Sequence, residues 1–266
     1  MVSPADAARF RAANQELEDR IEKNIRQLWR GLGAASPQEK RDALMDYVPG
    51  LVDTYGEVAA TIAAEYFEET TGGTAVLADT YSREAVQGSV RAFAGRLWTG
   101  EQTTVLAGVS AAARRHMLQR GRSTLYESAL RTPGVAYARM PEPGACNWCL
   151  LLSSRGAVYA KDTVTKVSEA RIWTGTSGMR GRRPGEDFHD DCRCDGVAVP
   201  DGDDLPYDAD ALYEEKYMPA RTAEPESLVS RDDFPTDAAY RRRVEELTGM
   251  SDRAISARMR VMFGGR

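Results

Sequence analysis

Hydrophobic residues recur at three- and four-residue steps through the first half of the chain, as they do along one face of an amphipathic helix. The first such stripe consists of Leu17, Ile21, Ile25, Leu28 and Leu32. Ser-Pro pairs at 3–4 and 36–37 each place a capping side chain before a proline at the first helical position. We therefore expect helices to begin at both pairs, with a kink or break in the second helix at the Pro-Gly pair 49–50.

Two more helices are predicted before residue 131. The glycines at 72–73 are typical of a turn, after which Ser82 opens a helix with Val86, Val90, Phe93 and Leu97 at near-helical spacing. Another helix begins near Glu101. These segments predict a helical domain over residues 1–131, without a visible active site.

The pattern changes to alternation after Thr132. Residues 135–140 alternate as a strand does, residues 157–159 and 197–200 suggest two further short strands, and 150–152 form a short apolar element. Residues 201–266 contain an acidic linker and predicted helices at 212–217 and 236–262. The expected fold class is α+β, mainly α: a helical domain (1–131), a small β-rich module (132–200) and a partly helical tail (201–266).

All four cysteines lie in two short clusters inside the β-rich module. Cys146 and Cys149 form a Cys-x-x-Cys pair, and His189, Cys192 and Cys194 follow about forty residues later. Zinc binds four thiolate or imidazole ligands in a tetrahedron, and a Cys-x-x-Cys turn presents two sulfurs on one side of a loop. The spacing therefore predicts a Zn²⁺ site that stabilises a module too small to bury much apolar surface.

Five candidates for four positions leave the ligand set open. We favour Cys146, Cys149, His189 and one of Cys192 or Cys194, over a site made of cysteines alone. In an extended Cys-Arg-Cys segment, both sulfurs would face the same side. Two disulfides or free thiols are the alternatives, and disulfides need an oxidising compartment.

The predicted zinc site is structural. A catalytic zinc keeps an open position with a general base beside it, and the chain has no His-Glu-x-x-His helix. Zinc-dependent nucleobase deaminases place His-x-Glu before Pro-Cys-x-x-Cys, which is the reverse of the order here. The other histidine, His116, is expected to be a packing or surface residue, so no catalytic residue is assigned.

Charge and hydropathy restrict the partners. The formal net charge of −5 gives no general attraction to nucleic acid, although Arg180, Arg182 and Arg183 make a small basic patch, which is also typical of a solvated loop. No stretch approaches the roughly 18 uncharged apolar residues that span a bilayer. We expect a soluble chain that is not exported and does not bind membranes.

The run Pro-Glu-Pro-Gly-Ala-Cys-Asn-Trp-Cys-Leu-Leu-Leu-Ser-Ser-Arg-Gly-Ala-Val-Tyr, followed by Phe-His-Asp-Asp-Cys-Arg-Cys, resembles the MuF-like minor capsid (head morphogenesis) proteins of tailed phages, especially those of actinobacteriophages. The resemblance covers roughly residues 85–200. It carries over to Cys146, Cys149, His189, Cys192 and Cys194, whereas Asp190 stands where many relatives have proline.

The resemblance implies a multimeric, low-copy structural protein of the virion that assembles in the host cytoplasm. Expected partners are the portal or major capsid protein, with weak contact to packaged DNA. One alternative is a capsid maturation hydrolase that uses Cys146 or Cys149 with His189. The other is a zinc module that binds nucleic acid through its arginine patch.

Two further expectations concern the ends of the chain. The apolar stripes of the first and last predicted helices are expected to be available to partner chains. Because no candidate ligand lies in the helical domain, chelation is expected to loosen mainly residues 135–200.

Overall fold

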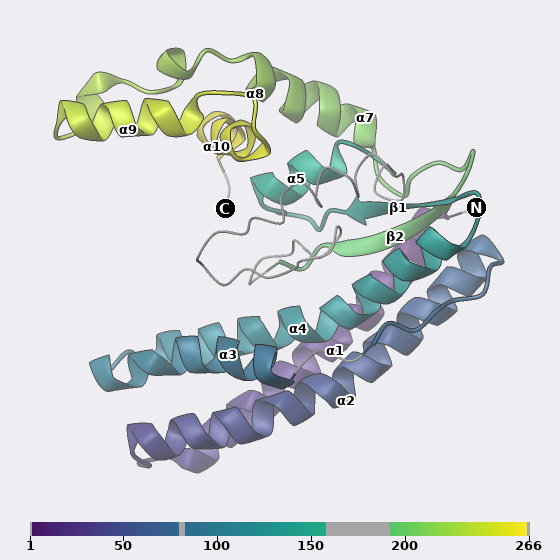
Figure 1. Cartoon of the computed structure of the whole chain (residues 1–266), viewed down its shortest axis with the longest axis vertical. Helices are drawn as coiled ribbons and strands as arrows, with labels where there is room; N and C mark the ends of the chain where they lie inside the picture. The colour runs from purple at the N-terminus through teal and green to yellow at the C-terminus, as the bar shows by residue number, and fades with distance from the viewer. Residues whose placement is uncertain (1, 80–82, 158–191, 265–266) are drawn as a thin grey trace.

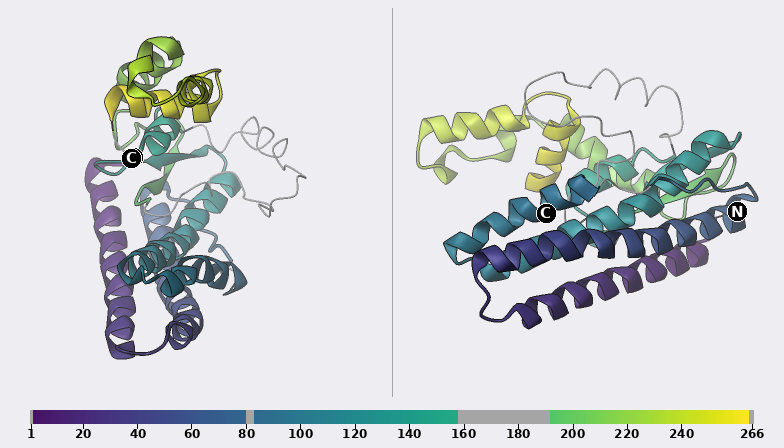
Figure 2. Two further views of the ribbon diagram at one scale, coloured as in Figure 1. Left: turned by 90° about the vertical axis from the view of Figure 1, so that its left-hand side faces the viewer. Right: turned by 60° about the horizontal axis from the view of Figure 1, so that its bottom comes forward.

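The computed structural model describes residues 2–79, 83–157 and 192–264, and its fold is mainly α with one two-stranded sheet. Figure 1 shows three tiers: long helices form the first, the strands with a short helix form the second, and the C-terminal helices form the third. The turned views in Figure 2 keep this order. The predicted fold class is therefore confirmed.

The first tier consists of four α-helices and one 3-10 turn. They are α1 (Pro4–Leu32), α2 (Pro37–Thr71), α3 (Arg83–Ala94), η1 (Gly95–Thr99) and α4 (Gln102–Arg131). The side chains of Ser3 and Ser36 each accept a hydrogen bond from the backbone N–H of an acidic residue three positions on, and the carboxylate of that residue accepts one from the serine backbone N–H. These capping boxes confirm both expected helix starts, because they satisfy backbone donors that would otherwise lack partners.

Helix α2 runs through Pro49 without interruption, so of the kink or break expected there, a break is wrong. Proline has no backbone N–H to bond the carbonyl four residues earlier, which is that of Met45. Gln87 on α3 supplies the missing donor, since its Nε2 lies 3.2 Å from the Met45 carbonyl oxygen. A neighbouring helix thus compensates for the proline.

The apolar stripe of α1 is buried within the chain. Leu17, Ile21 and Ile25 belong to a hydrophobic core shared with α2, α3 and α4, and α1 packs on α2 and α4. The expectation that this stripe is available to partners is wrong, because its central residues are almost inaccessible to solvent.

The second tier is an antiparallel sheet of β1 (Val135–Met140) and β2 (Asp195–Pro200), with Val135 opposite Pro200 and Met140 opposite Asp195. Helix α5 (Asn147–Ser153) follows β1 and contains the apolar run at 150–152. The first predicted strand is confirmed, and the closing strand begins two residues earlier than expected. Most of the strand predicted at 157–159 lies outside the described residues.

The third tier is helical. It contains α7 (Ala209–Leu212), the π-helical turn η2 (Tyr213–Tyr217), α8 (Met218–Thr222), η3 (Pro225–Leu228), η4 (Arg231–Asp233), α9 (Asp237–Leu247) and α10 (Asp252–Phe263). The helix expected at 212–217 is confirmed. The single helix expected over 236–262 is wrong: Gly249 has φ of 96°, and Ser251 caps a new helix through the Ala254 N–H.

Helix α10 packs on α5 and α8, and Ile255 and Met259 are buried in the core around the sheet. The Asn147 side chain donates to the Gly264 carbonyl at 2.9 Å, and Arg155 pairs with Asp252. The last apolar stripe is therefore also largely buried within the chain. The three-domain division stays a prediction, and residues of all three parts contribute to this core.

Among the residues that the structure describes, no helix combines the length and the apolar character needed to cross a membrane.

Candidate metal centre

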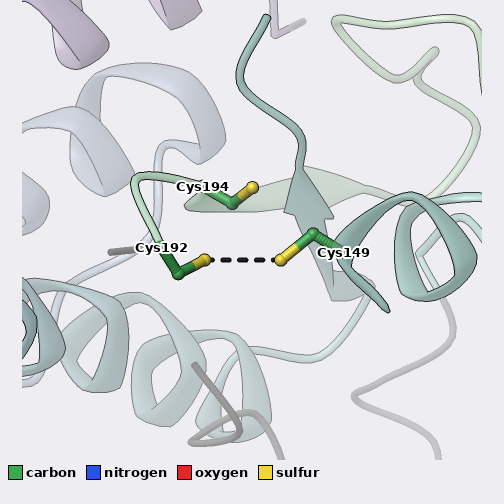
Figure 3. A group of neighbouring side chains, drawn as sticks. All are labelled: Cys149, Cys192 and Cys194. Carbon is green, nitrogen blue, oxygen red and sulfur yellow. Dashed lines mark hydrogen bonds between the residues drawn. The ribbon is translucent and has the colours of Figure 1, made fainter. Parts of the chain in front are cut away.

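Three cysteine sulfurs converge between the sheet and α5. The Sγ atoms of Cys149, Cys192 and Cys194 all lie within 4.8 Å of one another, and the three side chains are buried. Figure 3 shows the Cys149 and Cys192 sulfurs pointing toward each other from α5 and from the segment before β2. The structure therefore brings together thiols from both predicted clusters, close enough to hold one metal ion.

The first pair stands at the start of α5. After β1, the chain turns through Pro141 and Pro143, and Gly144 adopts φ of 80°. Cys146 is the N-cap residue of α5, and its Sγ lies 3.5 Å from the backbone N of Cys149. The Cys149 thiol also interacts with the Cys146 side chain. The Cys-x-x-Cys spacing thus places both sulfurs at one helix end.

The second pair leads into β2. The sulfurs of Cys192 and Cys194 both lie within 4.8 Å of the Cys149 sulfur, as expected for alternate residues of an extended segment. Arg193 projects elsewhere, and its Nε lies 3.1 Å from Oε2 of Glu18 on α1. Neither Cys192 nor Cys194 is set apart from the cluster, although the favoured ligand set used only one of them.

Two buried arginines flank the thiols. Arg139 on β1 directs Nη1 at the Cys149 sulfur, 3.7 Å away, and Arg122 on α4 donates from Nη2 to the Cys192 carbonyl at 3.0 Å. Each side chain is only 3% exposed. Buried guanidinium groups are stabilised by nearby negative charge, and metal-bound thiolates supply such charge. The surroundings of the cluster therefore fit a thiolate-bound cation.

The thiols titrate as a coupled group. Hydrogen bonds with Cys149 and Cys194, together with the charge of Arg122, lower the pKa of Cys192 despite its burial. Hydrogen bonds with the other three cysteines, and then burial, raise the pKa of Cys149. The hydrogen bond with Cys149 acts to lower the pKa of Cys194, but Cys192 and burial outweigh it and raise that pKa to about 12. The shared hydrogen bonds thus make the protonation of each thiol depend on the other two.

A buried polar network joins this centre to α1. Asn14 donates from Nδ2 to Oδ1 of Asp195 at 2.8 Å, directly after the Cys-x-Cys segment. Arg11 donates to the Pro141 carbonyl at 2.8 Å, and its Nε lies 3.5 Å from Oδ2 of Asp195. Burial raises the pKa of Asp195 despite Arg122, Asn14 and Arg11. The segments that flank both cysteine pairs therefore contact the same helix.

Sequence reasoning missed this network. Arg11, Asn14 and Glu18 lie at helical spacing beside the apolar stripe of α1, where polar residues are ordinarily solvated. Burial of Asn14 and Glu18 becomes visible only once β2 lies against the helix. No local signal distinguishes them from surface residues.

The predicted site residues have different outcomes. Cys149, Cys192 and Cys194 meet, and Cys146 adjoins Cys149, whereas His189 and the arginines of the basic patch lie outside the described residues. All four cysteines are described and none forms a disulfide. The choice between four cysteines and a set with His189 stays open on this geometry.

His116 is a buried residue of α4. Its Nε2 lies 2.9 Å from the Ser89 Oγ and 3.3 Å from Nη2 of Arg115. A serine beside a histidine is the beginning of a nucleophile–base pair, but this histidine is buried and its Nε2 also contacts Arg115 Nη2. The arrangement fits the expected packing role.

A family model described as VG15 protein matches residues 1–220. The chain belongs to the VG15 protein family. This is a family of viral (phage) proteins, and its match includes the whole first tier and all four cysteines. No curated protein and no solved structure matches the chain.

Proposed function

We propose that this VG15 chain is a structural minor capsid protein of a tailed phage, of the MuF-like head morphogenesis type. In this proposal it associates with the portal or the inner shell during assembly, DNA packaging or ejection. It is present in the virion in several copies and contacts the portal or major capsid protein. Its contact with packaged DNA is weak and decreases with salt, because the chain is acidic overall.

The closed cysteine cluster is the observation that carries a structural role. Cys149, Cys192 and Cys194 are 0%, 5% and 1% exposed, and they join two segments far apart in the chain. A nucleophile or a catalytic metal must be reached by substrate, whereas a structural metal is enclosed by its ligands. This burial therefore favours a stabilising centre over the hydrolase alternative.

The proposed ion is Zn²⁺, held by Cys146, Cys149, Cys192 and Cys194. Thiolates favour zinc over hard cations such as Mg²⁺. Cys146 completes the set of four because it adjoins Cys149 at the start of α5. Bound zinc would join α5 to the start of β2 without a chemical reaction.

Particle composition tests the assembly role. In the phage that encodes this chain, mass spectrometry of purified procapsids and virions should detect the chain at low copy relative to the major capsid protein. Co-expression with the portal protein should yield a complex that sediments together. Absence of the chain from both kinds of particle would refute the proposal.

Metal analysis tests the centre separately. The reduced, purified chain should hold about one zinc per chain, and Cys149→Ser should lose it. Cys146→Ser should weaken zinc binding in the same assay if the set is all cysteine. Full zinc retention by Cys146→Ser, together with loss in His189→Ala, would replace Cys146 by His189 in the set.

The same variants address the hydrolase alternative. Cys149→Ser should aggregate or fail to enter particles, because loss of metal loosens the fold around α5. A Cys149→Ser chain that folds, keeps zinc and enters particles but blocks cleavage of the capsid protein would favour the hydrolase instead.

A further inference from the structure

Two of the clustered sulfurs are close enough to react with each other. The Sγ atoms of Cys149 and Cys192 lie 3.3 Å apart and point toward each other (Figure 3). A disulfide bond is about 2.0 Å long, so they need to approach by little more than 1 Å. Cys149 is held on α5, whereas Cys192 lies in a segment without regular secondary structure. The latter segment can move more readily.

We propose that Cys149 and Cys192 are a redox-reactive dithiol, in which disulfide formation and metal binding exclude each other. The proposal rests on the metal-binding function above. Each sulfur bonds either to the cation or to the other sulfur. The centre then has two states: a metal-bound state, and an oxidised state that has lost two of its ligands.

The oxidant is a peroxide, whose small size suits a buried site. One thiol attacks the O–O bond of hydrogen peroxide, which gives a sulfenic acid and one water. The second thiol attacks that sulfur, so the S–S bond forms, the S–O bond breaks and a second water leaves. Overall, two thiols and one hydrogen peroxide give one disulfide and two waters.

The geometry favours this pair over the two cysteines of the Cys-x-x-Cys motif. The Cys146 sulfur accepts the Cys149 backbone N–H at the start of α5. A Cys146–Cys149 disulfide would remove this cap, whereas a Cys149–Cys192 disulfide leaves it in place. A Cys149–Cys192 bond also keeps the start of β2 beside α5 after metal loss.

Peptide mapping tests the proposal on the full chain. Reduced protein is prepared loaded with zinc or stripped by a chelator, exposed to a few equivalents of hydrogen peroxide, alkylated and digested. We expect a Cys149–Cys192 linked peptide in the stripped sample, and at least about tenfold less in the zinc-loaded sample. A predominant Cys146–Cys149 or Cys149–Cys194 link, or no link, would overturn the assignment of the pair.

Matched variants provide the controls. Cys192→Ser should abolish the linked peptide, and Cys146→Ser should retain it after stripping. Circular dichroism of both variants tests their folding. The comparison of zinc-loaded with stripped wild-type chain does not depend on whether the variants fold. A disulfide that forms equally in both wild-type samples, when zinc is shown to be bound in one, refutes mutual exclusion. A reduced chain that never binds zinc but forms the link instead refutes the metal function.

Discussion

At the scale of single residues, a close contact between α2 and α4 depends on Gly121. A Cβ atom at this position would lie 2.8 Å from the Ala59 carbonyl oxygen. Backbone cannot move aside as a flexible side chain can, so Gly121→Ala should force the helices apart and cost about 1–3 kcal/mol of unfolding free energy. Urea denaturation measures this cost.

Gly88 on α3 is the matched control, because a Cβ there meets nothing within 4 Å. Gly88→Ala should stabilise the chain by about 0.5–1 kcal/mol through helix propensity alone. Equal effects of the two substitutions would show that the contact with Ala59 does not limit the packing.

Glu18 links stability to pH. Burial raises its pKa from 4.5 to about 7, although Arg193, Arg114 and Arg122 act to lower it. A carboxyl whose pKa is raised by folding binds its proton more tightly in the folded chain. The resulting stabilisation is fully present below about pH 4.5, and is lost as the pH rises to about 7.

The Glu18→Gln variant should remove up to about 3 kcal/mol of this pH dependence. Urea denaturation of the variant and wild type between pH 4 and 8, with both chains in the same metal state at each pH, measures the difference. Glu16→Gln, at an exposed position of the same helix, is the control for removal of a charge. Parallel stability curves for wild type and Glu18→Gln would contradict the expectation.

Sequence alone located the thiols but not their surroundings. Cysteine spacing reflects local ligand geometry, so the convergence of Cys149, Cys192 and Cys194 could be anticipated. Arg122 and Arg139 could not, because their burial depends on α4 and β1 meeting the cysteine segments. Contacts between segments far apart in the chain leave no periodic pattern in the sequence.

At the scale of elements, α2 tolerates Pro49 because α3 completes its hydrogen bonding. Gln87→Ala would leave the Met45 carbonyl without this donor and should cost about 1 kcal/mol. In a Pro49→Ala background, the new backbone N–H can bond the same carbonyl, so Gln87→Ala should cost less. A double-mutant cycle measured by urea denaturation gives the coupling, and a zero value would contradict this account.

Helix α1 should respond to loss of metal. Asn14 contacts Asp195 and Glu18 contacts Arg193, and these two residues flank Cys194, a proposed zinc ligand. Loosening of that segment removes these contacts, so chelation should speed amide exchange in residues 4–22 about tenfold, as well as in 192–200. The loosening on chelation that the sequence predicted for residues 135–200 should therefore extend into α1 of the first tier.

Hydrogen–deuterium exchange with mass spectrometry measures this response. The control is 102–112, the first turns of α4, which precede its contacts with the cysteine segment at Arg122. Faster exchange in 192–200 with unchanged exchange in 4–22 would show that α1 is held by its apolar core alone.

Helix starts were more predictable than helix continuity. Ser3 and Ser36 each cap a helix through a residue only three positions away, so the sequence near each serine is enough to predict the cap. The uninterrupted α2 depends on Gln87 from another helix. The interruption before α10 arises at Gly249, whose positive φ no periodicity of apolar residues could indicate.

At the scale of the whole molecule, the family-matched part depends on the residues that follow it. The match ends at residue 220, yet Ile255 and Met259 are 2% and 0% exposed in the core around the sheet. A chain ending at 220 should therefore unfold at a lower urea concentration than the full chain and bind a hydrophobic dye. Met250→Ala, at a position 67% exposed, should leave the midpoint nearly unchanged. An unchanged midpoint for the shortened chain would contradict this dependence.

The pairing of β1 with β2 has a consequence for how the chain can vary. Met140 and Asp195 are partners in the sheet, so the chain leaves β1 and enters β2 at the same place. Loop-closure entropy grows only slowly with length, by roughly 0.6 kcal/mol for each doubling. Between the two cysteine pairs, residues could therefore be added or exchanged at small cost while both ends stay in register. The paired ends of β1 and β2 therefore allow connections of different length between the two strands.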